Sequence, residues 1–432
     1  MGDFNYIHSM KKNYLILLAC IVFFSNSNAQ KHALSAHQII DGTGNVLEQK
    51  ALIIEGNKIV DIIDKQDLPK SMPTIDLGNY TLLPGLIDAH VHTNYSSDDY
   101  QVNHLKESSA TKALTALKQL QDLLAAGWTT VRIAGDADVA YGSMDVKRAI
   151  NKGLFVGPHI YGAAHYLSVT GGGGDINFIS PEQNVIADGL IVNGPEEIRK
   201  AIRNEIKNGS DWIKILATGA FMTTGDNPQN VHFSTDELKM AMEEAARRDV
   251  PVMAHAHATE GIKQAVKAGA RSIEHGSYLD EEAINLMANS GTYLIPTLTI
   301  NLYFKEKIAD SKALTKAIEL SKDSRAGVYD NLKIALRKGV KIGVGTDYIG
   351  WTPNFSAREF SELVKIGMTP MQAIQAGTKV NAEMLKKDKE IGTLEIGKLA
   401  DIIAVKGDPL KDITELQNVK FVMIGGKVVK NE

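Results

Sequence analysis

The chain has 432 residues, of which 44% are hydrophobic and 23% are charged, and its formal net charge is -4 at pH 7. This is the composition of an ordinary globular protein with enough apolar material for a large core, and the length suits a barrel with additional elements. The weakly acidic charge and the lack of a basic run argue against a nucleic-acid partner.

The first 29 residues have the pattern of a secretory signal peptide. Two lysines precede an apolar stretch at 14–24, and the small residues Ser27 and Ala29 occupy the −3 and −1 positions of a cleavage site. The apolar stretch is shorter than the roughly 20 residues that a transmembrane helix needs. We therefore expect export to the periplasm or secretion, cleavage after Ala29, and no transmembrane span in the mature form.

The single cysteine, Cys20, lies inside this leader segment. Because it follows Leu17-Leu18-Ala19, a lipoprotein signal is an alternative, but the apolar run continues through 21–24, where a lipoprotein would begin a polar tether. Cleavage after Ala29 would leave a mature chain with neither disulfides nor thiolate metal ligands.

The two ends of the remaining chain both read as short strands. Residues 51–60 form a hairpin pattern with Gly56-Asn57 at the turn, and 401–405 and 421–429 have the apolar pattern of strands near the C-terminus. We therefore expect a small β-sandwich domain built from 30–81 and 386–432, with a separate body at 82–385.

The body alternates between strand and helix patterns. Ser234 and Glu237 form a capping-box pattern at the start of one helix, and glycines at 127, 209, 269 and 291 stand where helices should end. The eight candidate strands are 82–92, 129–135, 159–164, 212–217, 252–257, 272–276, 292–299 and 341–347. Eight strand–helix units predict an α/β fold of the (β/α)8 TIM-barrel type.

Ligand-type side chains occur in these candidate strands, mostly at their ends. They are His90, His92, Lys214, His255, His257, His275 and Asp347. Singly each has a simpler interpretation, because a His-x-His pair is often incidental, a lysine often snorkels, and an aspartate often caps a turn. Together they place five of the twelve histidines at one mouth of the barrel, which predicts a metal site.

The ligand types indicate which metal the site would hold. Imidazole and carboxylate ligands suit zinc and similar ions. A neutral Lys214 could react with carbon dioxide, and the resulting carbamate could bridge two cations.

These motifs resemble those of the amidohydrolase superfamily. The string Leu-Pro-Gly-Leu-Ile-Asp-Ala-His-Val-His at 83–92 is similar to its opening motif, and 397–403 is similar to its closing strand. The later metal motifs follow in family order as Ile213-Lys214-Ile215, His255-Ala256-His257, Ile273-Glu274-His275-Gly276 and Gly345-Thr346-Asp347. The similarity begins near residue 36 and continues to the C-terminus. Within the superfamily, the chain resembles imidazolonepropionase-like and Xaa-Pro dipeptidase-like proteins.

The resemblance implies an enzyme that hydrolyses a carbon–nitrogen bond with two divalent metal ions, and the ligand types predict that these ions are zinc. It assigns His90, His92 and Asp347 to one ion and His255 and His275 to the other. It further implies that carboxylated Lys214 bridges the ions and that metal-activated water attacks the scissile carbonyl.

The same resemblance gives two residues a catalytic role. Asp347 would accept the proton of the water and return it to the leaving nitrogen. His257 would contact substrate or stabilise the oxyanion, with the alternative that it only supports the ligands. The small substrate could be an Xaa-Pro dipeptide or an N-acyl amino acid, and a homo-oligomer remains open.

Two long loops follow strands of the predicted barrel. Loops at 165–193 and 218–233 should overhang the mouth. In the first, Gly173 stands where relatives commonly have a histidine, so its amides either form an anion-binding nest or belong to a plain loop. Two other functions are alternatives to a two-metal hydrolase. A one-metal imidazolone-ring hydrolase or deaminase is disfavoured by Lys214, which would bridge two ions. A non-catalytic binding protein is disfavoured because the ligand set is complete.

Overall fold

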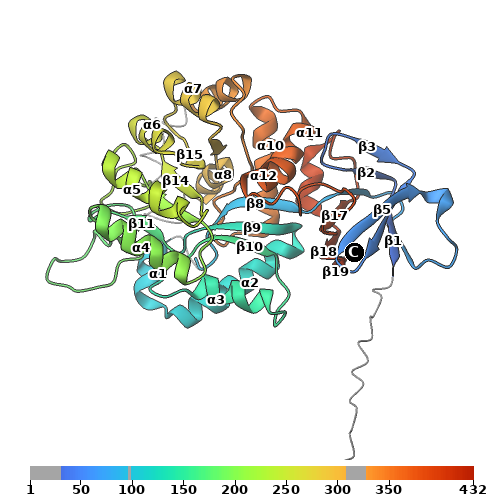
Figure 1. Ribbon diagram of the computed structural model, residues 1–432, viewed down its shortest axis with the longest axis horizontal. Helices are drawn as coiled ribbons and strands as arrows, with labels where there is room; N and C mark the ends of the chain where they lie inside the picture. Colours follow the sequence, from blue (N-terminus) through green and yellow to red (C-terminus); the bar gives the residue numbers. More distant parts are fainter. Residues whose placement is uncertain (1–30, 96–98, 308–326) are drawn as a thin grey trace, which may run out of the picture.

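The computed structural model describes residues 31–95, 99–307 and 327–432 (Figure 1). The predicted signal peptide at 1–29, including Cys20, lies outside the described residues. Figure 1 shows a large body in which helices surround a set of strands, and beside it a smaller region of strands next to the C-terminus. Within the described ranges, no helix is both long enough and apolar enough to cross a membrane.

The strands of the large body run parallel in two hydrogen-bonded sheets, with the orders β10-β9-β8 and β12-β11-β13-β14-β15-β16. The strands of the first sheet are β8 (Leu86–Val91), β9 (Trp128–Ala134) and β10 (His159–Ala163). Those of the second are β11 (Tyr166–Ser168), β12 (Leu190–Ile191), β13 (Ile213–Leu216), β14 (Val252–Ala256), β15 (Ser272–His275) and β16 (Tyr293–Ile295). Parallel strands buried on both faces explain the continuous apolar runs of the sequence.

Backbone hydrogen bonds also join segments beyond these two sheets. The amides of Asp211 and Trp212, just before β13, donate to the carbonyl of Gly162 in β10. On the other side, Leu294 of β16 donates to the carbonyl of Lys341, and Asp347 donates to the carbonyl of His90 in β8. The order of the elements is therefore TIM-barrel-like, as the sequence predicts.

The predicted eighth strand differs from a regular strand. The segment at 341–348 makes only isolated bridges, Leu294 to Ile342 and Val91 to Tyr348. A Cβ at Gly343 would lie 2.2 Å from Asn381 Oδ1, and one at Gly345 would lie 2.3 Å from a side-chain carbon of Ile295. The glycines thus allow a close approach to the neighbouring elements, and this approach replaces regular pairing.

The predicted first strand at 82–92 is two strands. It divides at Gly85 into β7 (Thr81–Pro84) and β8, and β7 pairs with β2 and β17 of the smaller region instead of with the body. A Cβ at Gly85 would lie 2.0 Å from Thr129 Oγ1, so glycine is required where the chain passes between the two regions.

Helices follow most of the strands of the body. They are α1 (Tyr100–Lys106), α2 (Ser109–Ala125), α3 (Gly142–Asn151), α4 (Pro195–Lys207), α5 (Thr235–Ala246), α6 (Thr259–Ala268), α7 (Glu281–Ser290), α8 (Leu298–Lys307), α10 (Arg358–Lys365), α11 (Pro370–Gln375) and α12 (Asn381–Met384). The predicted capping box of Ser234 and Glu237 is present at α5, and Gly269 and Gly291 end α6 and α7 in the left-handed conformation.

The smaller region contains two sheets, with the orders β5-β4-β1-β6 and β19-β18-β17-β7-β2-β3. Their strands are β1 (His32–Ser35), β2 (Gln38–Ile40), β3 (Val46–Glu48), β4 (Lys50–Glu55), β5 (Lys58–Asp64), β6 (Thr74–Asp76), β17 (Ile402–Val405), β18 (Phe421–Ile424) and β19 (Lys427–Asn431). One apolar cluster joins the two sheets, and it includes Leu34, Leu52, Ile402 and Phe421. Both chain ends therefore contribute strands and core residues to this region, while its exact domain boundaries stay a prediction.

Candidate metal centre

The structure brings the seven predicted site residues together at the carboxyl ends of the strands. His90, His255 and His275 lie at or near the ends of β8, β14 and β15, and Lys214 lies within β13. His92 and His257 follow β8 and β14, and Asp347 lies in the irregular segment beside β8. All seven side chains are largely buried.

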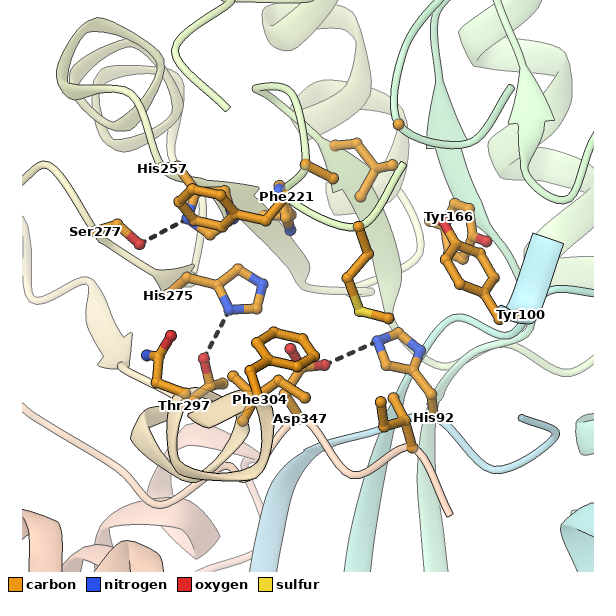
Figure 2. A pocket seen from close by; sticks show the side chains of 18 of the residues that line it. His92, Tyr100, Tyr166, Phe221, His257, His275, Ser277, Thr297, Phe304 and Asp347 are labelled. Carbon is orange, nitrogen blue, oxygen red and sulfur yellow. Dashed lines mark hydrogen bonds and ion pairs between the residues drawn. The ribbon is translucent and has the colours of Figure 1, made fainter. Parts of the chain in front are cut away.

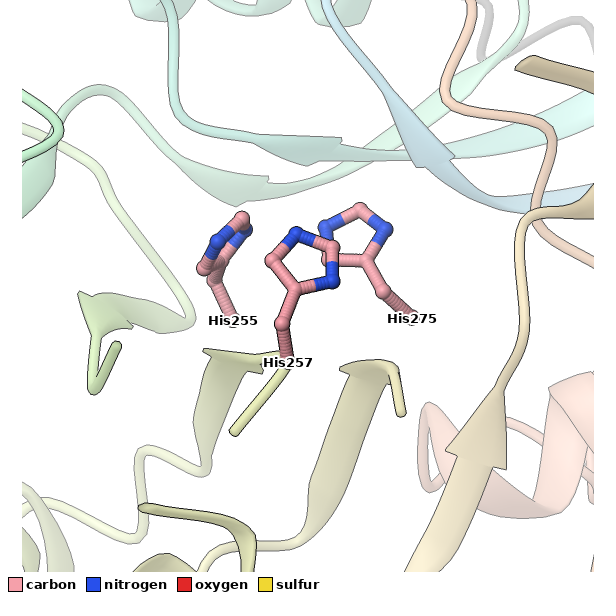
Figure 3. Close-up of side chains that lie close together, drawn as sticks. All are labelled: His255, His257 and His275. Carbon is pink, nitrogen blue, oxygen red and sulfur yellow. The ribbon is translucent and has the colours of Figure 1, made fainter. Parts of the chain in front are cut away.

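Two groups of these side chains could hold a metal ion. Group 1 is His90, His275 and Asp347, and group 2 is His255, His257 and His275; within each group the ligand atoms lie within 4.8 Å of one another. Figure 3 shows the three rings of group 2 gathered at the ends of their strands. His275 belongs to both groups. The structure also places His257 within ligand range, although the sequence interpretation gave this residue a substrate role instead.

Hydrogen bonds on the outer ring nitrogens orient these histidines. Nδ1 of His90 donates to Glu274 Oε2 at 2.7 Å, Nδ1 of His92 to the Gly135 carbonyl, and Nε2 of His255 to the Gly219 carbonyl at 3.1 Å. Because carboxylate and carbonyl oxygens only accept, the neutral rings of His90 and His255 keep their other nitrogen unprotonated. An unprotonated imidazole nitrogen is the atom that binds a metal.

The other two histidines, His257 and His275, have hydroxyl partners at Nδ1. Nδ1 of His257 lies 2.7 Å from Ser277 Oγ, and Nδ1 of His275 lies 2.7 Å from Thr297 Oγ1. His90 Nε2 is buried without a hydrogen-bond partner in the described structure, and it lies 3.5 Å from Asp347 Oδ1. A buried nitrogen of this kind fits a metal ligand, because an unsatisfied buried polar atom is otherwise costly.

Burial sets the charge state of the site. It lowers the pKa of His90, His255 and His275 well below the usual histidine range, with further lowering by neighbouring positive charges. Burial, followed by the charge of Lys214, lowers the pKa of His257 to about 3. These four imidazoles are therefore neutral at neutral pH, which is the form that binds metal ions.

The lysine and the carboxylate of the site are shifted as well. Burial lowers the pKa of Lys214 to about 8, although the charges of Glu274 and Asp347 act in the opposite direction. Burial alone would raise the pKa of Asp347, but its hydrogen bond with His92 and the positive charge of Lys214 make the net shift downward. Asp347 is therefore ionised at neutral pH.

A buried ion pair that the sequence interpretation missed supports His90. Arg132 of β9 donates to both oxygens of Glu274 at 2.8 Å, and its Nε donates to the carbonyl of Ala89 at 2.6 Å. Both charged side chains have 0% exposure. β9 and β15 belong to different sheets, and the pair of Arg132 and Glu274 joins them. Together with the bond from Arg132 to Ala89 in β8, it holds these three strands around His90. Glu274 directly precedes His275 in the sequence, but its strand position alone does not distinguish a ligand from a partner of a ligand.

A second buried carboxyl that the sequence interpretation missed positions the segment of Asp347. Asp88 accepts hydrogen bonds from Thr346 Oγ1 at 2.6 Å, from the Thr346 amide at 3.1 Å and from the His90 amide at 3.1 Å. Burial raises the pKa of Asp88 to about 7 despite these bonds. Asp88 therefore ties β8 to the segment that carries Asp347.

Backbone strain is concentrated at this centre. Among the described residues other than glycine, six have a positive φ, and three of them are His275 at 71°, Thr297 at 49° and Asp347 at 59°. A left-handed conformation is unfavourable for such residues and persists only where surrounding contacts hold it. Two of the three are proposed ligands, and the third contacts His275.

The pocket over the centre has two different sides. Figure 2 shows Tyr100 and Tyr166 on one side, and His257, Ser277, His275 and Thr297 on the other. Tyr95 stacks on His92 with ring centres 5.0 Å apart, so the aromatic side begins directly at a proposed ligand. The pocket is lined by His92, Tyr95, Tyr100, Tyr166, Gly173, Lys214, Leu216, Ala220, Phe221, Met222, His255, His257, His275, Ser277, Pro296, Thr297, Ile300, Asn301, Phe304, Asp347 and Ile349.

The two loops predicted to overhang the mouth do contribute to this lining. Gly173 comes from the first loop, and Ala220, Phe221 and Met222 come from the second. Three of the four glycine amides already have acceptors within the loop, because Gly171 donates to Asp175 Oδ2, Gly172 to the Val169 carbonyl and Gly174 to Ser168 Oγ. The interpretation of this stretch as a plain loop is therefore favoured.

The fold and the site define a TIM-barrel-like protein whose histidine and carboxylate side chains could hold divalent metal ions. The model of the Amidohydrolase family matches residues 81–429. The chain therefore belongs to the amidohydrolase family, whose members generally bind divalent metals.

Individual relatives agree with this assignment. The chain is 33% identical to ochratoxinase of Aspergillus niger over 441 residues, which covers 95% of this chain and 89% of that protein. It is 23% identical to imidazolonepropionase of Bdellovibrio bacteriovorus over 385 residues, 84% of each chain. A crystal structure of a Xaa-Pro dipeptidase with bound methionine in the active site is similar, with a TM-score of 0.87, 34% identity, and coverage of 93% of this chain and 100% of that one. The chain is an enzyme that hydrolyses carbon–nitrogen bonds.

Proposed function

We propose that this chain is an exported binuclear amidohydrolase that cleaves the amide or peptide bond of a small substrate, either an Xaa-Pro dipeptide or an N-acyl amino acid. In this proposal, eight segments of the body form a closed (β/α)8 barrel, and both chain ends form a β-sandwich. The proposed ligands of two zinc ions are His90, His92, Lys214, His255, His275 and Asp347.

One observation carries the proposal: the outer nitrogens of His90 and His255 donate to acceptor-only oxygens, while the inner nitrogens of these neutral rings remain unprotonated. His90, His92 and Asp347 would hold one ion, and the group containing His255 and His275 the other. Asp347 lies 3.3 Å from His92 Nε2 and 3.5 Å from His90 Nε2, a spacing that fits ligands around one centre.

Lys214 is the residue proposed to bridge the two ions. It is buried within β13, and it lines the same pocket as His92, His255 and Asp347. Its amine nitrogen would bond to the carbon of carbon dioxide and lose a proton, which gives a carbamate with two oxygens. One carbamate can therefore serve both ions.

The residues of the chain have separate tasks in the reaction. When bound, divalent ions of this kind lower the pKa of water and polarise a carbonyl oxygen. Asp347 is ionised, so its carboxylate can accept a proton and return it to the leaving nitrogen. His257 keeps Nδ1 on Ser277, which turns its Nε2 toward the group that includes His255 and His275 and makes it available to an oxyanion or to substrate. The aromatic side of the pocket, which includes Tyr95, Tyr100 and Tyr166, would limit the access of bulk water to the bound substrate.

The metal content of the protein tests the binuclear arrangement. We expect about two zinc ions per wild-type chain by elemental analysis, and about one in Lys214→Ala, because the bridging group is lost. The rate of hydrolysis by Lys214→Ala should also fall, because the second ion is lost. Lys263→Ala is the matched control, since Lys263 pairs with Asp280 and Glu282 away from the pocket. One tightly held ion with full activity would instead favour the one-metal imidazolone-ring hydrolase or deaminase.

The substrate and the location need separate measurements. Zinc-loaded protein should be assayed against Xaa-Pro dipeptides, other dipeptides, N-acyl amino acids, lactones and imidazolone compounds. Turnover of lactones or imidazolones without any amide cleavage would contradict the proposed bond specificity. For export, fractionation of cells should recover the processed chain outside the cytoplasm, and an uncleaved cytoplasmic chain would contradict it.

A further inference from the structure

Helix α8 begins one residue after Thr297, whose hydroxyl contacts His275, and it forms part of the pocket wall. Ile300, Asn301 and Phe304 of this helix line the pocket, and Figure 2 shows Phe304 near Thr297 and Asp347. Its first amides need partners, because the first turn of a helix leaves its N–H groups without intrahelical acceptors. The placement of α8 therefore depends on the group that accepts from its first turn.

That group is the buried side-chain carboxyl of Glu359 from another helix, and burial raises the pKa of Glu359 to about 8 despite the hydrogen bonds that it makes. Glu359, the second residue of α10, has 0% exposure. Its Oε1 accepts from the Leu298 amide at 2.9 Å, and its Oε2 accepts from the Thr299 amide at 2.7 Å and from Thr299 Oγ1 at 2.6 Å. These three hydrogen bonds to one buried carboxyl group fix the first turn of α8 relative to α10.

The residue immediately before this turn contacts a proposed metal ligand. Thr297 has a φ of 49°, which is unusual for a β-branched residue, and its Oγ1 lies 2.7 Å from Nδ1 of His275. A strained residue keeps its conformation only when its neighbours are held in place. Glu359 holds the next two residues along the chain, so it also fixes the position of the Thr297 hydroxyl.

We propose that Glu359 is a positioning residue for the metal centre, acting through the first turn of α8 and Thr297 to orient His275. His275 is common to both ligand groups, so a change in its ring orientation would affect both ions. The inference rests on the proposed function, because it takes His275 as a zinc ligand. Glu359 does not line the pocket and does not contact the reacting atoms.

Zinc affinity, measured by competition with a chromophoric chelator, tests this role in the full chain. In Glu359→Gln an amide NH2 group replaces one acceptor oxygen, so the turn loses a bond. We expect zinc to bind about tenfold more weakly, the lower end of the effect of changing groups that orient metal ligands. Glu362→Gln is the matched control, because Glu362 is a buried acid of the same helix that pairs with Lys365 and Tyr329 instead of α8. Its zinc affinity should stay within about twofold of wild type.

A double-mutant cycle separates positioning from a general loss of stability. Thr297→Val keeps a β-branched side chain but removes the hydroxyl that contacts His275, and it should also weaken zinc binding about tenfold. If Glu359 acts through Thr297, the double variant should bind zinc about as well as Thr297→Val alone, whereas independent effects would multiply to about a hundredfold. Thr299→Val removes one of the three bonds to Glu359 and should give a smaller loss of the same kind, which covers the case in which Glu359→Gln fails to fold.

Two results would overturn the proposal: unchanged zinc affinity in both Glu359→Gln and Thr299→Val, or multiplied losses in the double variant. His275→Ala, measured in the same titration, distinguishes a failure of this inference from a failure of the proposed function. If His275→Ala loses zinc but Glu359→Gln and Thr299→Val do not, only the positioning role of Glu359 is wrong. If His275→Ala binds zinc normally, the proposed ligand set is wrong, and so is the positioning role.

Discussion

The two ligand groups of the metal centre are held in place by different kinds of contact. Group 1 contains the carboxylate of Asp347, and its His90 is supported by the fully buried pair of Glu274 and Arg132. The ligands of group 2 are imidazoles only. Their outer partners are neutral, namely the Gly219 carbonyl and the hydroxyls of Ser277 and Thr297.

This difference determines how each group responds to substitution. A buried charge that loses its partner is strongly unfavourable, because the remaining charge has neither water nor a counter-ion. A neutral hydrogen bond contributes only about 1 kcal/mol on balance. Substitutions at group 1 and its partners should therefore cause large losses of stability or activity. Substitutions at the neutral partners of group 2 should cause small ones.

The largest expected effect is on catalysis, at the carboxylate of group 1. Asp347→Asn removes the negative charge and the proton acceptor, so kcat/KM of the zinc-loaded enzyme should fall by about 10²- to 10⁴-fold. Asp249→Asn is the matched control, because Asp249 also has a positive φ, 53°, but is exposed and pairs with Lys386. Equal activity of the two variants would show that Asp347 has no part in proton transfer.

The next effect concerns stability and the charged support of His90. Arg132→Met leaves Glu274 buried without its counter-ion, and the free energy of unfolding should fall by about 3–5 kcal/mol. Urea denaturation of the metal-free protein would measure this loss. The combined variant with Glu274→Gln should recover part of it, because the uncompensated charge is then gone. A loss below about 1 kcal/mol in Arg132→Met alone would show that the pair contributes little to group 1.

The sequence indicates the side chains of both groups better than it indicates the residues that hold them in place. His90, His255 and His275 are recognisable because they end apolar strands and match family motifs. Arg132 and Glu274 lie 142 residues apart, and no local pattern indicates that they meet. The same limit applies to Glu359 and α8, whose contact depends on the packing of two distant helices.

The fold shows the same division between local and long-range information. The capping box of α5 and the hairpin of β4 and β5 were predictable, because turn and cap residues act over a few positions. The division of 82–92 at Gly85 and the irregular segment at 341–348 were not. Both depend on close approach to residues elsewhere in the chain, such as Thr129 and Asn381.

The smallest expected effect is at the neutral support of group 2. Ser277→Ala removes the partner of His257 Nδ1, which lies 2.7 Å from the hydroxyl. Because Ser277 is partly exposed in the pocket, water can replace the hydroxyl, so the free energy of unfolding should fall by at most about 1 kcal/mol. The informative measurement is therefore kcat/KM beside urea denaturation. A loss of kcat/KM of up to about tenfold with near-normal stability is expected if Ser277 orients a ring that acts on substrate. A loss as large as that of Asp347→Asn would mean that group 2 is as intolerant of change as group 1, and the contrast between the two groups would not hold.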